Sequence, residues 1–355
     1  MYLALLALPT TSPLLVVTLI IVGYLFSVRY FRYTWQRETE DMPLARYRAM
    51  GRLVALYDMP TISRTASTFG FFIPTPFPEF KINGQKRYDD TELLLAEMVE
   101  RCVEVGRSEA AIARLNVIHG AYNISDDDYL FTLTLFVVPA VQWVARWGWR
   151  PFTAKEADAI ALAWSELGAN MGMPAHRLPL DYAGYLQMFN EYTSPDSPHY
   201  RIRPSAAGAA VTRDSLETVY TWVPAAVVPL LRPALTWLIR GCLPSDVTAA
   251  IGLAPAGPTH RALISGFLHL RAFIIRHACL PRPSWWPYVV TSGKVLPSGA
   301  RAAPCSRSYR ATGYCIGSLG PAKFAAAPTS EAHPPTIHAA NVAAWMARRD
   351  AHYGW

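Results

Sequence analysis

The sequence predicts an all-α protein with one N-terminal transmembrane helix. Apolar residues recur at helical spacing along most of the chain, and the two-residue alternation typical of β-strands is rare. The first 28 residues contain no charged side chain, and residues 3–28 form a long, predominantly apolar run. Because about 20 apolar residues suffice to cross a bilayer, we expect residues 1–28 to be a membrane anchor.

The segment that follows this run predicts its orientation. Arg29, Arg32 and Arg37 come next, among aromatic residues, and positive charge beside a membrane helix favours the cytosolic side. The body of the protein is therefore expected in the cytosol. A cleaved signal peptide fits less well, because no basic segment precedes the run, which is also longer than the about 7–15 apolar residues of such peptides.

Composition limits the classes of partner. The chain has 355 residues, of which 52% are hydrophobic and 17% charged, and its formal net charge is +7. Residues 289–355 hold seven basic residues and two acidic ones, so the rest of the chain is nearly neutral. No basic face interleaved with aromatic residues is visible, and we expect no nucleic-acid partner. The five scattered cysteines contain no CxxC pair, which disfavours a zinc ribbon.

Periodicity and capping residues predict the helices of the body. Ser108 and Ser125 are the expected N-caps of two helices, and Thr153 forms a capping box with Glu156. The expected helices cover residues 91–105, 108–123, 125–147, 153–172 and 263–280.

Residues 219–242 look at first like a second membrane span. Pro224, Pro229, Arg232 and Pro233 interrupt the run, and proline and arginine are costly in the middle of a lipid-facing helix. A buried or membrane-skimming pair of helices is therefore preferred to a true span.

The last part of the chain differs in composition from the body. Residues 289–355 are rich in Ala, Pro, Ser and Gly, and such a composition buries little apolar surface. We expect a disordered tail here, after a body that comprises residues 29–288.

One histidine, His119, lies among apolar residues on an expected helix. Ile112, Leu115 and Tyr122 are spaced to share its face. One interpretation is a core histidine bonded to a carbonyl. The other is an iron ligand, because haem needs one protein nitrogen in a dry pocket. The chain has no HExxH, no GxSxG and no Gly-rich phosphate loop, so a non-haem metal site or a hydrolase has little support.

A second candidate lies in KRYDDTELLLAEM, residues 86–98. Arg87, Asp90 and Thr91 have helical spacing and share a face if the helix begins early enough. The alternative is a helix start in which Asp89 or Asp90 is the N-cap.

Five stretches in order carry a resemblance to a known family. They are MPTISRTASTFG (59–70), KRYDDTELLLAEMVE (86–100) and residues 113–144, 149–174 and 268–283. Together they resemble the family of ER-bound MpaB oxygenases and latex-clearing rubber oxygenases. The likeness covers roughly residues 29–287 of the sequence.

The resemblance implies a globin-like core that holds one b-type haem. Its iron ligand would be His119, in an R-x-x-x-x-H motif that begins at the cofactor-binding Arg114. In the rubber-cleaving members an Arg-x-x-Lys-Thr stretch lines the distal side of the haem. Arg87 and Thr91 match its ends and are the expected catalytic residues, whereas Asp90 replaces the lysine.

The resemblance also implies a function. The implied protein is a haem-dependent oxygenase with a single pass through the ER membrane, and it uses O2 to cleave a C=C bond in a lipophilic, prenyl- or terpenoid-like substrate. The expected partners are this substrate, O2 and membrane lipid, and the sequence identifies no redox partner. The alternatives are a non-catalytic, membrane-anchored haem or lipid binding protein and a purely structural membrane protein with His119 in its core.

Overall fold

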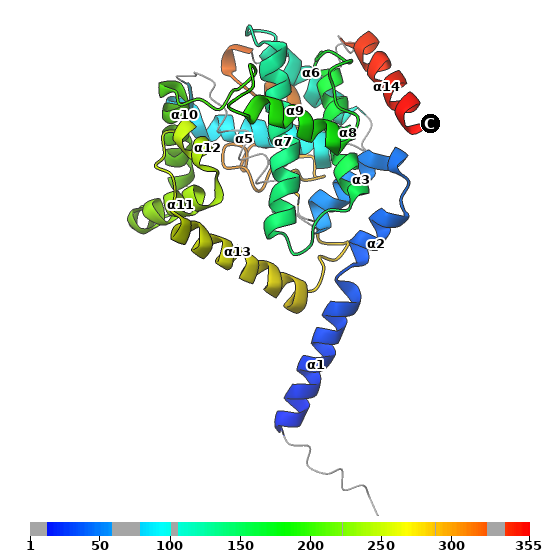
Figure 1. Cartoon of the computed structure of the whole chain (residues 1–355), viewed down its shortest axis with the longest axis vertical. Helices are drawn as coiled ribbons and strands as arrows, with labels where there is room; N and C mark the ends of the chain where they lie inside the picture. The colour runs from blue at the N-terminus through cyan, green and yellow to red at the C-terminus, as the bar shows by residue number, and fades with distance from the viewer. Residues whose placement is uncertain (1–12, 59–78, 101–105, 222, 288, 325–337) are drawn as a thin grey trace, which may run out of the picture.

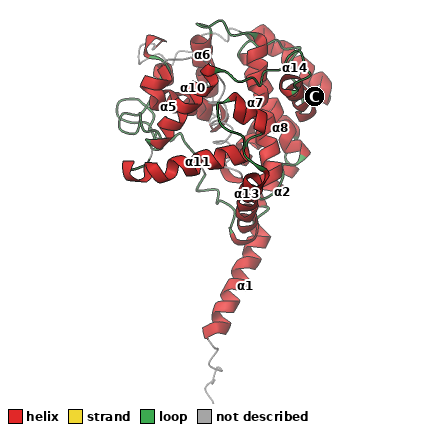
Figure 2. Cartoon of the chain, turned by 60° about the vertical axis from the view of Figure 1, so that its left-hand side comes forward, coloured by secondary structure: helices red, strands yellow, loops and turns green. Residues whose placement is uncertain are grey.

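The computed structural model describes residues 13–58, 79–100, 106–221, 223–287, 289–324 and 338–355. Within these ranges the chain is helical and has no β-strand, apart from two isolated bridges at Arg301 (Figure 2). The prediction of an all-α protein is confirmed for these residues.

Most helices gather in one body, from which α1 projects (Figure 1). The helices are α1 (Pro13–Phe31), α2 (Thr34–Asp41), α3 (Tyr47–Leu53), α5 (Glu79–Glu100), α6 (Arg107–His119), α7 (Asp126–Trp147), α8 (Ala154–Asn170), α9 (Tyr182–Thr193), α10 (Ala206–Tyr220), α11 (Val228–Cys242), α12 (Ser245–Ala250), α13 (Pro258–Ala278) and α14 (Ala339–Tyr353).

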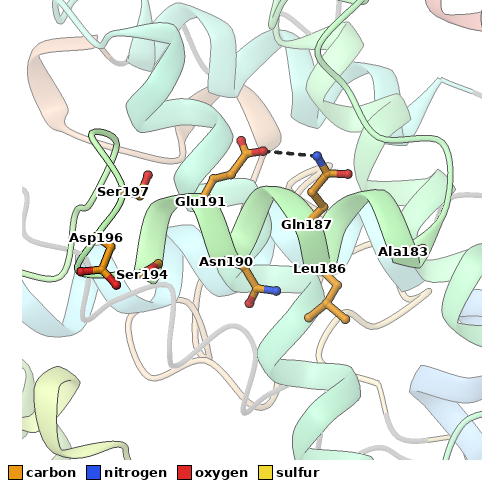
Figure 3. A pocket seen from close by; sticks show the side chains of 8 residues that line it. All are labelled: Ala183, Leu186, Gln187, Asn190, Glu191, Ser194, Asp196 and Ser197. Carbon is orange, nitrogen blue, oxygen red and sulfur yellow. Dashed lines mark hydrogen bonds between the residues drawn. The ribbon is translucent and has the colours of Figure 1, made fainter.

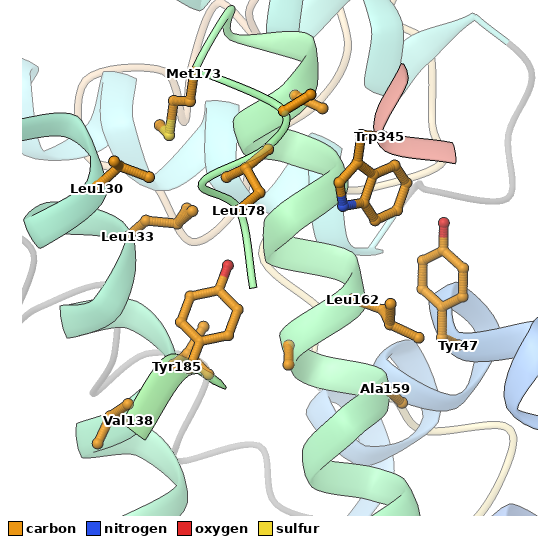
Figure 4. Packing of buried hydrophobic residues seen from close by; sticks show 14 of the residues in the cluster. Tyr47, Leu130, Leu133, Val138, Ala159, Leu162, Met173, Leu178, Tyr185 and Trp345 are labelled. Atoms are coloured by element: carbon orange, nitrogen blue, oxygen red, sulfur yellow. The ribbon is translucent and has the colours of Figure 1, made fainter. Parts of the chain in front are cut away.

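Helix α8 lies at the centre of the larger apolar core. Helices α3, α7, α9 and α14 pack around it, and the cluster includes Tyr47, Leu133, Leu162 and Tyr185 (Figure 4). Trp345 of α14 is fully buried in the same cluster. Burial of a large apolar side chain contributes about 1.5–3 kcal/mol to stability. Helix α14 is therefore part of the core through Trp345.

Two of the three expected helix starts are confirmed. The Ser125 hydroxyl accepts a hydrogen bond from the N–H of Asp128 at 3.2 Å, and both bonds of the Thr153–Glu156 capping box are present. Ser108 is not an N-cap. Helix α6 begins one residue earlier, after Gly106, whose φ of 84° is readily adopted only by glycine.

Helix α5 begins well before the expected start at residue 91. It runs from Glu79 with a kink at Asn83, so residues 86–98 lie inside a helix. Asp89 and Asp90 therefore do not cap it, and the interpretation of this stretch as a helix start is wrong. The expected continuation to residue 105 falls on residues 101–105, outside the described part of the chain.

The described residues after 288 correct the expectation of a disordered tail. Residues 289–324 pack on α5 and α6, where Val290, Tyr314, Ile316 and Leu319 join a second apolar cluster. Gly320, with a φ of 96°, lies so close to α6 that an added Cβ would come within 2.5 Å of an Ile118 methyl group. Residues 289–324 are called the strap below.

Acidic side chains of α5 hold the strap in place. Glu100 accepts hydrogen bonds from the N–H groups of Val290 (2.7 Å) and Thr291 (2.9 Å) and from the Thr291 hydroxyl (2.6 Å). Asp89 accepts one from the N–H of Ser308 at 2.7 Å. The composition of the strap did not reveal its ordered structure, because that order depends on residues outside the strap. The buried carboxylates of α5 need hydrogen-bond donors, and the strap supplies them.

The run at residues 219–242 is broken as its prolines suggest. Helix α10 ends at Tyr220, and α11 has 15 residues with Pro233 inside, which gives a length of about 22 Å. By length and composition, two described helices could cross a membrane, Asp126–Trp147 and Ala225–Cys242. The first is α7, which lines the core, so these two criteria alone do not identify a span.

The predicted anchor lies partly outside the described residues, since residues 1–12 are not among them. Its described part is α1, a 19-residue helix. Leu19, Ile20 and Phe26 are exposed on it, with several other apolar side chains. The single transmembrane helix remains a prediction that this exposed apolar surface favours.

Candidate functional site

His119 is the last residue of α6. The N–H of Tyr122 bonds its backbone carbonyl at 2.9 Å, which turns the chain out of the helix. Its ring faces Tyr129 of α7, with ring centroids 5.9 Å apart. The histidine therefore lies where α6 meets the first turns of α7.

The surroundings of His119 keep its imidazole neutral. Burial lowers its pKa from 6.5 to about 4, and the positive charge of Arg87 acts in the same direction. Its Nδ1 atom is buried and has no hydrogen-bond partner among the described residues. The interpretation as a core histidine bonded to a carbonyl finds no support at this nitrogen.

The structure brings Arg87 near His119. Helices α5 and α6 pack against each other, and the Arg87 guanidinium is close enough for its charge to act on the imidazole. Thr91 lies one turn after Arg87, and its hydroxyl donates to the Arg87 carbonyl at 3.0 Å. The two predicted catalytic residues are thus neighbours on one helix, and the Thr91 hydroxyl hydrogen is already engaged.

Asp90, which stands where the resemblance places a lysine, is engaged with the strap. Its carboxylate accepts from the Lys86 ammonium at 2.8 and 3.1 Å and from the Tyr309 hydroxyl. Burial raises the pKa of Asp90, while the bonds from Lys86 and Tyr309 oppose that rise. This carboxylate serves to join α5 to the strap.

Arg114 also binds the strap. Its Nε donates to the Leu319 carbonyl at 2.7 Å and its Nη1 to the Phe324 carbonyl at 2.5 Å. Arg114 and His119 are five positions apart, so the two side chains leave α6 about 140° apart. The bonds observed for Arg114 are structural, and its role in cofactor binding remains a prediction.

Sequence reasoning missed Lys86 and Tyr309. Both contact Asp90, and Lys86 also donates to the Gly320 carbonyl at 3.0 Å. Tyr309 is 219 residues from Asp90 along the chain, and no local pattern in the sequence connects such distant positions.

The donors at this site fit haem better than a bare metal ion. No group of three or more His, Cys, Asp or Glu side chains that could hold a metal occurs in the described ranges, whereas protein-bound ions usually need that many ligands. Haem brings its porphyrin nitrogens and needs one axial side chain. A single neutral histidine with a buried Nδ1, such as His119, meets that need.

A surface hollow of about 620 Å³ lies elsewhere, along α9 (Figure 3). Its lining residues are Ala183, Leu186, Gln187, Asn190, Glu191, Ser194, Asp196 and Ser197. None of the predicted site residues lines it, and six of its eight lining residues are polar. We therefore place the candidate site at His119 and not in this hollow.

Comparison with known proteins agrees with the resemblance. The ER-bound oxygenase mpaB' of Penicillium brevicompactum is 27% identical over 242 residues, which cover 65% of this chain and 55% of that protein. The ER-bound oxygenase mpaB of Penicillium roqueforti is 36% identical over 137 residues, 38% of this chain and 44% of the relative. The matches thus span about half the length of these relatives.

The family match contains every predicted site residue. It covers residues 86–276, more than half of the chain, and the family is described as ER-bound oxygenase mpaB/B'/rubber oxygenase, catalytic domain. The strap lies outside the matched residues. On this match, the chain belongs to the family of ER-bound mpaB and rubber oxygenase catalytic domains.

Proposed function

We propose that this protein is a haem-dependent oxygenase of the ER membrane that uses O2 to cleave a C=C bond in a lipophilic, prenyl- or terpenoid-like substrate. Its family membership supports an oxygenase, and the names of its relatives support the ER location. In this proposal the helical body is the globin-like haem domain, and α1 with the preceding residues is the single anchor, with the body in the cytosol.

The observation that carries the proposal is the state of His119. A half-buried imidazole with a pKa of about 4 and a buried, unsatisfied Nδ1 is a costly feature in a helical body. Such a feature is explained if the histidine binds something that satisfies it. A haem iron uses one neutral nitrogen from the protein.

In this proposal His119 and the side chains near it have different roles. When bound, haem supplies the activation of O2. His119 would hold the iron, and Arg87 would stabilise negative charge that develops on oxygen by donating hydrogen bonds. Thr91 could assist only after its hydroxyl leaves the Arg87 carbonyl, so we assign it the smaller part.

The proposed reaction balances with one O2 per double bond. The C=C and O–O bonds break, and each of the two carbons gains one oxygen atom as a carbonyl group. The net reaction consumes no reductant. A substrate that partitions into lipid would reach a protein anchored in the same membrane without crossing water.

The test is the haem content of the purified full-length chain. We expect a Soret band and about one haem per chain for the wild type and for His176→Ala, a control at an exposed histidine. His119→Ala should lose most of its haem while retaining its helical circular dichroism. Normal haem loading in His119→Ala would contradict the assignment of this histidine.

Turnover is tested separately on the haem-loaded protein. Incubation with a polyprenyl substrate under ¹⁸O2 should give carbonyl products labelled at both new C=O groups. Haem binding without O2-dependent product, across several prenyl and terpenoid substrates, would favour the non-catalytic haem-binding alternative.

A further inference from the structure

Helix α13 carries an apolar stripe that no described residue covers. Leu263, Phe267, Leu270 and Ile274 follow one another at intervals of four, three and four, so they share one face of the helix. All four are exposed, Phe267 by 61%. Ile264 and Ala272 are the buried residues of α13, and Ile264 packs against α11 at Gly241.

The stripe continues onto neighbouring elements. On α11 and the turn before it, Val227, Leu230 and Trp237 are exposed at helical spacing. The Trp237 ring stacks on His260 at the start of α13, with centroids 4.4 Å apart. Beyond the other end of α13, the Trp285 side chain is 79% exposed. These elements form one surface, called the basal surface below.

Basic residues predominate next to the basal surface. Residues 247–330 contain no Asp or Glu, and they contain seven arginines, at positions 261, 271, 276, 282, 301, 307 and 310. Arg240 belongs to α11, which has no acidic residue, whereas Arg232 of the same helix is paired with Glu217 of α10. A helix with an apolar face flanked by arginine and followed by exposed tryptophan is typical of interfacial membrane helices, which bind anionic lipid.

The basal surface is joined to the point where α1 enters the body. The Tyr24 hydroxyl of α1 donates to the Ala278 carbonyl at 2.8 Å. The Trp35 indole donates to the Arg282 carbonyl at 3.0 Å, and Arg32 to the Leu280 carbonyl at 3.3 Å. In Figure 1, α13 runs along the side of the body from which α1 projects.

We propose that the basal surface lies in the headgroup region of the membrane that α1 enters and binds anionic phospholipid. The Tyr24 bond joins α1 to the end of α13, and the bonds of Arg32 and Trp35 join the residues after α1 to the segment that follows α13. Helix α13 is about 30 Å long, but its inner face packs on the body. It therefore lies along the bilayer and does not cross it. This inference does not depend on haem.

The test uses the full-length chain in vesicles of phosphatidylcholine, with or without phosphatidylserine. The photoreactive residue p-benzoylphenylalanine replaces Phe267 or Leu270 on the basal surface, or Met346 as an exposed control on α14. After irradiation, mass spectrometry separates lipid adducts from adducts between chains. We expect lipid adducts at positions 267 and 270 to exceed those at 346 several-fold and to increase with phosphatidylserine.

A second variant tests the apolar contact itself. Ile274→Glu should reduce the lipid adduct at Phe267 several-fold, without changing the circular dichroism, because the side chain is exposed. Adducts between two chains at Phe267 or Leu270 would show that a second copy covers the surface. Lipid adducts no more frequent than at Met346 would show that water covers it. Either result overturns the proposal.

Discussion

Replacing Glu100 with alanine should destabilise the protein by about 3–5 kcal/mol. The substitution leaves two backbone N–H groups of the strap, those of Val290 and Thr291, without their acceptor. A buried donor left unsatisfied costs about 1–3 kcal/mol, and the Thr291 hydroxyl loses a bond to a charged group as well. Such a loss is a large fraction of the about 5–15 kcal/mol by which domains are usually stable.

Milder substitutions should give graded effects. Glu100→Gln keeps one carbonyl oxygen but turns an amide NH2 toward the strap donors, and should cost about half as much as alanine. Thr291→Val removes only the hydroxyl bond, so about 1 kcal/mol is expected. Glu191→Gln, at an exposed glutamate paired only with Gln187 in Figure 3, is the matched control and should stay within about 0.5 kcal/mol.

The assay is urea unfolding of the full-length protein in one fixed detergent, with linear extrapolation. Hydrogen exchange at residues 290–291 is measured in parallel, because these amides should lose protection even where global unfolding is little affected. If Glu100→Ala changes neither the unfolding free energy by more than about 0.5 kcal/mol nor this protection, the strap is not held by these bonds.

Three further predictions concern the site. Because the pKa of His119 is lowered to about 4 in the folded state, the unfolded chain binds more protons between about pH 6.5 and 4, and stability should fall as pH decreases through that window. In urea titrations of the haem-free protein, His119→Gln should reduce this pH-dependent loss of stability by up to about 3 kcal/mol. A variant with the same pH profile as the wild type would contradict this prediction. Arg87→Ala should keep its haem but raise the activation free energy of substrate cleavage by up to about 3–4 kcal/mol, and Thr91→Ala should raise it less. Cleavage rates equal to the wild-type rate in both variants would exclude these roles. Arg114→Ala should lower the free energy of unfolding by about 3–5 kcal/mol, because two charged hydrogen bonds to the strap are lost, and Arg114→Lys should lower it less. Unchanged stability together with a loss of haem would instead show that Arg114 binds the cofactor.

Local interactions explain what could be predicted from the sequence. Helix periodicity and the caps at Ser125 and Thr153 depend on residues within a few positions of each other, and the structure confirms them. His119 could be singled out for the same reason, because its apolar neighbours lie on its own helix. The early start of α5 was missed, since no capping pattern marks it and the kink at Asn83 lies inside it.

Only the tertiary structure decided the roles of the polar residues. Asp90 meets Tyr309, and Arg114 meets Leu319, across more than 200 residues of chain. Composition made residues 289–355 look unable to fold, because they are rich in Ala, Pro, Ser and Gly. The physical reason for its order lies in α5 and α6, whose buried charged groups must find hydrogen-bond partners, and those partners come from the distant strap.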